Sequence, residues 1–214
     1  MNLAAFYDAY WQKHGDAFDG QRLALLAKHV KPGERVLQVD CGPGVLASLL
    51  AEKGARVAAT ELSGEGARRA RARGVDIVRA DLDDGGLPFP ADSFEAVVCD
   101  SRMEHGIDFN RYLDECVRVL KPDGRFILSI PNTAHWRCRW WLLRGHFPYR
   151  AGTPTDWTHL RFFTLPEMRA LWAERRDLRR WRREVQARRR VGDREVLRFM
   201  IASLQTPLVR TPAA

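Results

Sequence analysis

The sequence predicts an α/β fold with a mostly parallel, doubly wound sheet. Short apolar runs with strand character alternate with helical segments between residues 35 and 130, which is the pattern of βα units joined in a parallel sheet. Acidic residues follow several of these runs, and ligands bind beyond the carboxyl ends of the strands in such sheets. The length of 214 residues suits one domain. We expect that domain to span residues 1–206, with a tail at residues 207–214.

The composition is that of a globular protein without a membrane span. Hydrophobic residues make up 45% of the chain, and the mean hydropathy is −0.37. No apolar run approaches the roughly 20 residues of a membrane helix, and the N-terminus lacks the pattern of a secretion signal. The four cysteines form no C-x-x-C pair. We therefore expect reduced thiols in a cytoplasmic protein and no metal site.

The first predicted βα unit carries the clearest motif. Residues 36–39 form an expected buried strand, and residues 45–53 an expected helix, with the tight turn Gly42-Pro43-Gly44 between them. A turn glycine lets the backbone approach a ligand closely, and the helix N-terminus presents unpaired N–H groups. Glu61 follows the first glycine by about 20 residues, where an acid can hold a ribose through its hydroxyl groups.

Further strands and helices are expected along the rest of the chain. The strands are predicted at residues 55–60, 75–79, 96–99 and 125–130, and the helices at residues 22–30, 64–73, 111–120 and 166–174. An amphipathic segment that begins at residue 6 precedes them. Thr164 and Glu167 have the spacing of a capping box at the start of the last helix.

Taken together, these motifs resemble those of class I S-adenosylmethionine (SAM)-dependent methyltransferases, over roughly residues 30 to 135. The resemblance implies a Rossmann-like fold, SAM as the cofactor, and two C-terminal strands that finish the sheet as an antiparallel hairpin. The stretches that match are residues 36–44, Glu61, residues 80–82, residues 87–98 and residues 120–128. The strands of the hairpin are expected at residues 177–187 and 195–205.

The resemblance also assigns residues to the cofactor. Glu61 is expected at the ribose, Asp81 at the adenine amino group and Leu82 against the adenine ring. Tyr10, in the leading segment, either closes the pocket or packs that segment on the sheet. The complete set of expected cofactor-binding residues is Tyr10, Asp40, Gly42, Gly44, Glu61, Leu62, Asp81, Leu82 and Asp100.

The first motif departs from the family pattern at two positions. The family usually has an acid where this chain has Gln38, and a glycine where it has Asp40. Side chains two apart on a strand share a face, so one interpretation is that Asp40 partly replaces the missing charge near the methionine end of the cofactor. The alternative is that the pocket is weakened or lost.

Residues 132–164 interrupt the βα pattern and are expected to form a lid over the methyl acceptor. They are similar to the corresponding part of the methionine-biosynthesis protein W family and of methyltransferases of ubiquinone and cell-surface glycan pathways. Their aromatic residues either hold a flat acceptor or pack the lid, and their arginines either bind an anionic acceptor or are solvated. The aromatic residues are Trp136, Trp140, Trp141, Phe147, Tyr149 and Trp157, and the arginines are Arg137, Arg139, Arg144 and Arg161.

Methyl transfer requires alignment of donor and acceptor, and a hydroxyl acceptor must also lose a proton. The candidates for a general base are His105, after the fourth predicted strand, and His135 and His159 in the insertion. A structural role is the alternative for each histidine, and catalysis by alignment without a base is a further alternative.

We therefore expect a methyltransferase that uses SAM on a small molecule, at oxygen. A methyltransferase-fold binding or regulatory subunit without catalysis is the alternative that the altered first motif supports. The net charge is +8, and many of the arginines lie in residues 175–190. A charged outer strand is favoured there over an RNA-binding segment, so a nucleic-acid partner is not favoured, and an RNA methyltransferase is the third and least favoured alternative. The sequence carries no signal for an oligomeric state.

Overall fold

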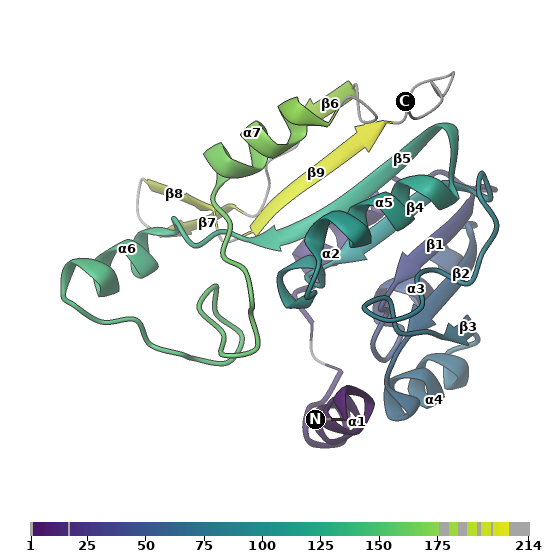
Figure 1. Cartoon of the computed structure of the whole chain (residues 1–214), viewed down its shortest axis with the longest axis horizontal. Coiled ribbons are helices and arrows are strands. Elements are labelled where there is room, and N and C mark those ends of the chain that lie inside the picture. Colours follow the sequence, from purple (N-terminus) through teal and green to yellow (C-terminus); the bar gives the residue numbers. More distant parts are fainter. Residues whose placement is uncertain are drawn as a thin grey trace.

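The computed structural model describes residues 2–16, 18–175, 180–183, 188–191, 194–197 and 199–205. Figure 1 shows how its elements are arranged. Its helices are α1 (Leu3–Lys13), α2 (Gly20–Ala27), α3 (Val45–Glu52), α4 (Gly64–Ala72), the short 3-10 helix η1 (Met103–His105), α5 (Phe109–Val119), α6 (Trp136–Leu143) and α7 (Leu165–Glu174). Its strands are β1 (Arg35–Val39), β2 (Arg56–Glu61), β3 (Asp76–Arg79), β4 (Phe94–Asp100), β5 (Leu120–Pro131), β6 (Arg180–Arg183), β7 (Arg188–Val191), β8 (Arg194–Leu197) and β9 (Phe199–Gln205).

A seven-stranded sheet with the order β3-β2-β1-β4-β5-β9-β6 organises the chain. The first five of these strands are parallel, so the predicted mostly parallel α/β sheet is confirmed. Strand β9 runs antiparallel to β5, and β6 runs antiparallel to β9. The two C-terminal stretches expected as strands contain these two elements, and the expected tail at residues 207–214 lies outside the described residues.

Helices cover both faces of the sheet, as a doubly wound fold requires. On β1, Val36 belongs to the apolar cluster with α2 and α3, whereas Leu37 belongs to the cluster with α5 and α7. The same alternation recurs on β5, where Ile127 and Phe126 face opposite layers, because successive side chains on a strand point to opposite faces. No helix in the described ranges is both long and apolar enough to cross a bilayer.

The structure corrects two local expectations. Strand β5 begins five residues earlier than expected, because its register against β4 shifts between Phe94 and Ala96 and brings Leu120 into the ladder. The capping box at α7 is wrong: Thr164 is the N-cap residue, but its side chain accepts no backbone hydrogen bond.

The insertion leaves the sheet after β5 and returns to the same place. Asn132 and Phe163 form an isolated bridge, and the backbone N–H of Thr133 donates to the Phe163 carbonyl at 2.9 Å. Helix α6 lies beyond the end of the sheet, at the left of Figure 1. The insertion contains the short basic, aromatic helix α6 at Trp136–Leu143, within a loop whose two ends are held together.

The turn between β1 and α3 allows a prediction about stability. Gly44 has φ +80°, and a Cβ built there would lie 2.8 Å from the Ala70 side chain and 2.9 Å from its Cα. Gly74 has a similar φ of +77° and nothing within 4 Å. A left-handed conformation costs an alanine roughly 1–2 kcal/mol at either site, and overpacking adds roughly 1–3 kcal/mol at Gly44 only.

Chemical denaturation of Gly44→Ala and Gly74→Ala should therefore show a clearly larger loss of unfolding free energy for Gly44→Ala. Equal losses in the two variants would mean that the close packing of α3 on α4 is not a constraint.

Candidate functional site

A cavity of about 390 Å³ lies at the carboxyl ends of β1, β2 and β4. Its wall combines the turn after β1 with residues of α1, η1 and the insertion, so segments distant in sequence meet there. Eight of the residues predicted to bind the cofactor or to act in catalysis line it, namely Tyr10, Asp40, Gly42, Glu61, Leu62, Asp100, His105 and His159.

The other four predicted site residues lie outside the described cavity wall. Gly44 caps α3, and Leu82 is buried in the apolar cluster under α5. The Asp81 carboxylate accepts a hydrogen bond from the backbone N–H of Asp83 at 3.0 Å. His135 is the N-cap of α6 and accepts from the backbone N–H of Arg137 at 3.3 Å. The structure therefore does not bring these four residues to the cavity.

The Glu61 carboxylate joins the turn after β1 to the start of α4. It accepts a hydrogen bond from the backbone N–H of Gly42 at 2.7 Å and another from that of Ser63 at 2.9 Å. Glu61 is 5% exposed. Burial, with the nearby Asp40 charge, raises the pKa of Glu61 to about 7.

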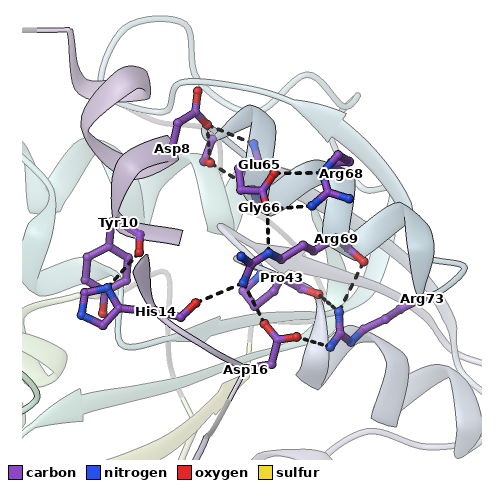
Figure 2. Close-up of polar contacts among 11 residues, drawn as sticks. Asp8, Tyr10, His14, Asp16, Pro43, Glu65, Gly66, Arg68, Arg69 and Arg73 are labelled. Atoms are coloured by element: carbon purple, nitrogen blue, oxygen red, sulfur yellow. Dashed lines mark hydrogen bonds and ion pairs between the residues drawn. The ribbon is translucent and has the colours of Figure 1, made fainter. Parts of the chain in front are cut away.

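Helix α1 closes one side of the cavity by packing on the glycine turn. A Cβ at Gly42 would lie 2.6 Å from the Trp11 ring, so only glycine allows this contact. The Asp8 carboxylate accepts hydrogen bonds from the Ser63 hydroxyl at 2.6 Å and from the backbone N–H of Glu65 at 3.0 Å. Figure 2 shows how Asp8 holds α1 against α4.

The segment after α1 is tied to the same helix. Asp16 pairs with Arg69 at 3.3 Å and with Arg73 at 2.6 Å, and Arg73 also donates to the Pro43 carbonyl of the turn at 3.1 Å. These contacts are drawn in Figure 2. The leading segment is thus attached to α4 at two separate points.

Asp40 forms a buried ion pair that the sequence analysis did not anticipate. Its backbone has φ +48°, and its carboxylate accepts hydrogen bonds from Arg102 Nε and, at 3.0 Å, from the Tyr112 hydroxyl. The Arg102 guanidinium lies 5.1 Å from the centre of the Tyr112 ring. Asp40 is therefore not an isolated acid, because a cation balances its charge.

Two atoms of this ion pair have no hydrogen-bond partner among the described residues. They are Asp40 Oδ1 and Arg102 Nη1, and both are buried. Both residues line the cavity. A buried charged group with an unused hydrogen-bonding position is costly unless a ligand fills it. The pair thus offers one acceptor and one donor to a bound molecule.

The far side of the cavity contains a carboxyl group and two imidazoles. Glu104 is 1% exposed, and neither of its oxygens has a partner among the described residues. Burial raises the pKa of Glu104 to about 8, with a further contribution from Asp100. The rings of His105 and His159 meet edge to face, with centroids 4.8 Å apart. Burial lowers the pKa of His105 to about 4, and it also lowers the pKa of His159, so both imidazoles are neutral at pH 7.

The aromatic residues and arginines proposed for acceptor binding lie elsewhere. The described cavity wall includes none of the six aromatic residues or four arginines of the insertion. Trp136, Trp140 and Trp157 are about half exposed. The Arg161 guanidinium donates to the backbone carbonyls of Gly106 and Ile107. The insertion instead contributes Gly152, Thr153, Asp156, Thr158 and His159 to the cavity.

Comparison with known structures defines the class of fold. A SAM-dependent methyltransferase from Mesorhizobium loti superposes with a TM-score of 0.63 at 22% identity, and the match covers 89% of this chain and 98% of that one. The protein therefore has the class I methyltransferase fold, and the cavity lies at the carboxyl ends of its parallel strands, where such sheets bind ligands.

Sequence comparison identifies the family. A family model described as methionine biosynthesis protein MetW matches residues 21–201, so the chain belongs to the MetW family. It is also 36% identical over 142 residues to a ubiquinone biosynthesis O-methyltransferase of Xylella fastidiosa, and 40% identical over 102 residues to a demethylmenaquinone methyltransferase of Clavibacter sepedonicus. The first match covers 61% of this chain and 57% of that relative, and the second covers 45% and 40%.

The buried Glu104 carboxyl makes stability depend on pH. Its pKa is about 8 in the folded protein, against an ordinary value of 4.5. Between pH 4.5 and 8 the unfolded chain is ionised at this position while the folded protein keeps its proton. The free energy of unfolding should therefore fall as pH rises through this window, by up to about 1.4 kcal/mol per pH unit from this group.

Glu104→Gln removes the titrating group and keeps its shape. In buffer free of divalent ions, its stability relative to the wild type should rise between pH 5 and pH 8, as measured by urea denaturation. A constant difference between the two proteins across this range would contradict the assignment.

Proposed function

We propose that this chain binds SAM in the cavity and transfers its methyl group to a hydroxyl group of a small molecule. The observation that carries the proposal is the pair of unused atoms on Asp40 and Arg102. The methionine part of SAM carries an ammonium and a carboxylate, so it fits a buried acceptor beside a buried donor. Bound SAM supplies an electrophilic methyl group on a sulfonium.

Other cavity residues have parts in this proposal. Glu61, with Leu62 beside it, would hold the ribose, because its carboxylate lies beside the glycine turn and can accept further hydrogen bonds. Tyr10 and Trp11 would close the pocket from α1. Gly42 would allow the close approach of the ligand to the backbone.

The acceptor is assigned to the end of the cavity formed by η1 and the insertion. An oxygen acceptor is supported by the Xylella relative, whose name describes an O-methyltransferase. His105 and His159 would face the acceptor, and Asp156 and Thr158 beside them offer further polar groups. His135 is not proposed for this role, because it lies outside the described cavity wall.

The binding mode can be tested with ligands that differ in the amino-acid part. The double variant Asp40→Asn/Arg102→Gln removes both charges of the pair together, and it also removes the 3.5 Å contact of Arg102 with Asp83. Two charge-assisted hydrogen bonds are worth about 1.5–3 kcal/mol each, so affinity for S-adenosylhomocysteine (SAH) should fall about a hundredfold or more. Affinity for 5′-methylthioadenosine, which lacks the amino-acid part, should be unchanged in calorimetry.

Glu61→Ala provides the matched control, because it should lower the affinity for both SAH and 5′-methylthioadenosine. If the wild type binds neither SAM nor SAH, the protein is a methyltransferase-fold subunit without catalysis, and the proposal fails. Equal losses for SAH and 5′-methylthioadenosine in the double variant would place Asp40 and Arg102 away from the methionine end.

We also propose that residues 145–156 act as a lid that becomes more ordered when ligand binds, because Gly152 and Thr153 reach the cavity from this stretch. Trypsin should cut after the exposed Arg150 in the ligand-free protein, and SAH should slow this cleavage severalfold. The fragments can be followed by mass spectrometry. An unchanged rate of cleavage with saturating SAH would count against a lid.

A further inference from the structure

Glu104, His105 and His159 form a cluster at the acceptor end of the cavity. Each of the three residues offers one ligand atom, and these atoms all lie within 4.8 Å of one another. Two of the residues come from η1 and the third comes from the insertion. Two imidazoles and one carboxylate are a ligand set used for divalent transition metals at catalytic sites with open positions.

The hydrogen bonds of the two histidines determine which ring nitrogen is available. His105 Nδ1 lies 3.1 Å from the Thr158 carbonyl oxygen, and His159 Nδ1 lies 3.2 Å from the Pro154 carbonyl oxygen. A carbonyl only accepts, so each Nδ1 must carry the proton and donate it. In a neutral ring this leaves the Nε2 lone pair unprotonated. Metal-binding histidines are commonly oriented by such a contact.

Glu104 supplies the observation that points to a ligand. The residue is 1% exposed, and both carboxyl oxygens are buried without a partner among the described residues. Burying a carboxyl group without a hydrogen bond is unfavourable, and burial holds the pKa of Glu104 near 8. The charged groups around it are Asp100, Arg102 and Arg22. Coordination to a cation would satisfy this carboxylate.

Hydrogen bonds join the backbone on the two sides of the cluster. The Glu104 carbonyl accepts hydrogen bonds from the backbone N–H groups of Leu160 at 2.8 Å and Arg161 at 3.1 Å. The Arg161 guanidinium donates to the carbonyls of Gly106 and Ile107, the two residues that follow η1. The insertion is therefore clamped to η1 beside His159, as a preorganised metal site requires.

We propose that Glu104, His105 and His159 bind a divalent transition-metal ion of the zinc type. Mg²⁺ and Ca²⁺ prefer sites made entirely of oxygen, whereas imidazole favours zinc and its neighbours. Bonds of about 2.1 Å in a tetrahedral site place ligand atoms about 3.4 Å apart, so ligand atoms that lie up to 4.8 Å apart must move closer together when an ion binds. The absence of C-x-x-C pairs suggested no metal site, and this cluster uses no cysteine.

The catalytic role of the ion rests on the proposed function. The binding of the ion by this cluster does not. An open coordination position would hold the acceptor hydroxyl and lower the pKa of that group. The O–H bond would break, and its proton would leave to bulk water. The oxygen would then form a bond to the methyl carbon, while the C–S bond breaks and its electron pair returns to sulfur, giving the methyl ether and SAH.

Zinc binding alone tests the site. Protein treated with a chelator and then freed of it should bind Zn²⁺ in calorimetry, and Co²⁺ should give visible absorption bands of a low-coordinate site. Glu104→Gln and His159→Ala should each weaken Zn²⁺ binding at least tenfold. His146→Ala is the control, because His146 is an exposed imidazole of the same insertion outside the cluster, and it should leave the affinity unchanged.

SAH affinity, measured in the same variants, separates this inference from the proposed function. Retained SAH binding shows that a variant is folded and that its cofactor site is intact. If the wild type binds SAH but not Zn²⁺, the proposed metal site is wrong, whereas the proposed methyltransferase function is unaffected. If Zn²⁺ binds with equal affinity to the wild type, Glu104→Gln and His159→Ala, the ion is held elsewhere and the inference fails. If the wild type binds Zn²⁺ but not SAH, and the substitutions weaken Zn²⁺ binding, the metal site is supported and the proposed methyltransferase function fails.

Discussion

The site depends on one buried carboxylate at the end of β2. Through its two oxygens, Glu61 holds the backbone N–H groups of Gly42 and Ser63, so the turn after β1 and the start of α4 share one anchor. Leaving a buried donor unpaired costs roughly 1–3 kcal/mol. Asp8 then binds the Ser63 hydroxyl and brings α1 to the same point. The shape of this side of the cavity is therefore set at the carboxyl end of a single strand.

Much of the fold could be predicted because its strands are short apolar segments bounded by turns. The five parallel strands and helices α3, α4 and α5 lie close to their expected positions, since local patterns record which side chains are buried. The early start of β5 could not be predicted, because it arises from a shifted register against Phe94 on another strand. The prediction of a capping box at Thr164 and Glu167 was wrong, because the spacing of two residues does not specify the side-chain rotamers that a capping box needs.

The cavity wall was predictable where residues follow a motif, as with Gly42 and Glu61. Arg102 and Glu104 were missed, although they lie shortly after the end of β4 at Asp100. In the sequence they are ordinary charged residues, and their burial arises only when η1 packs beneath the insertion. The same lesson applies to Asp40: its role follows from Arg102, which lies 62 residues further along the chain.

The attachments of the insertion include the bridge between Asn132 and Phe163 and the clamp of Leu160 and Arg161 on Glu104. Between these attachments, residues 134–157 form a closed excursion with no strand of the main sheet in it. Closing a longer loop costs little extra entropy, about 0.6 kcal/mol per doubling of length. Changes of length within residues 134–147 can thus be absorbed before Pro154, whose carbonyl oxygen lies 3.2 Å from His159 Nδ1, so this part of the excursion can diverge while that imidazole keeps its place.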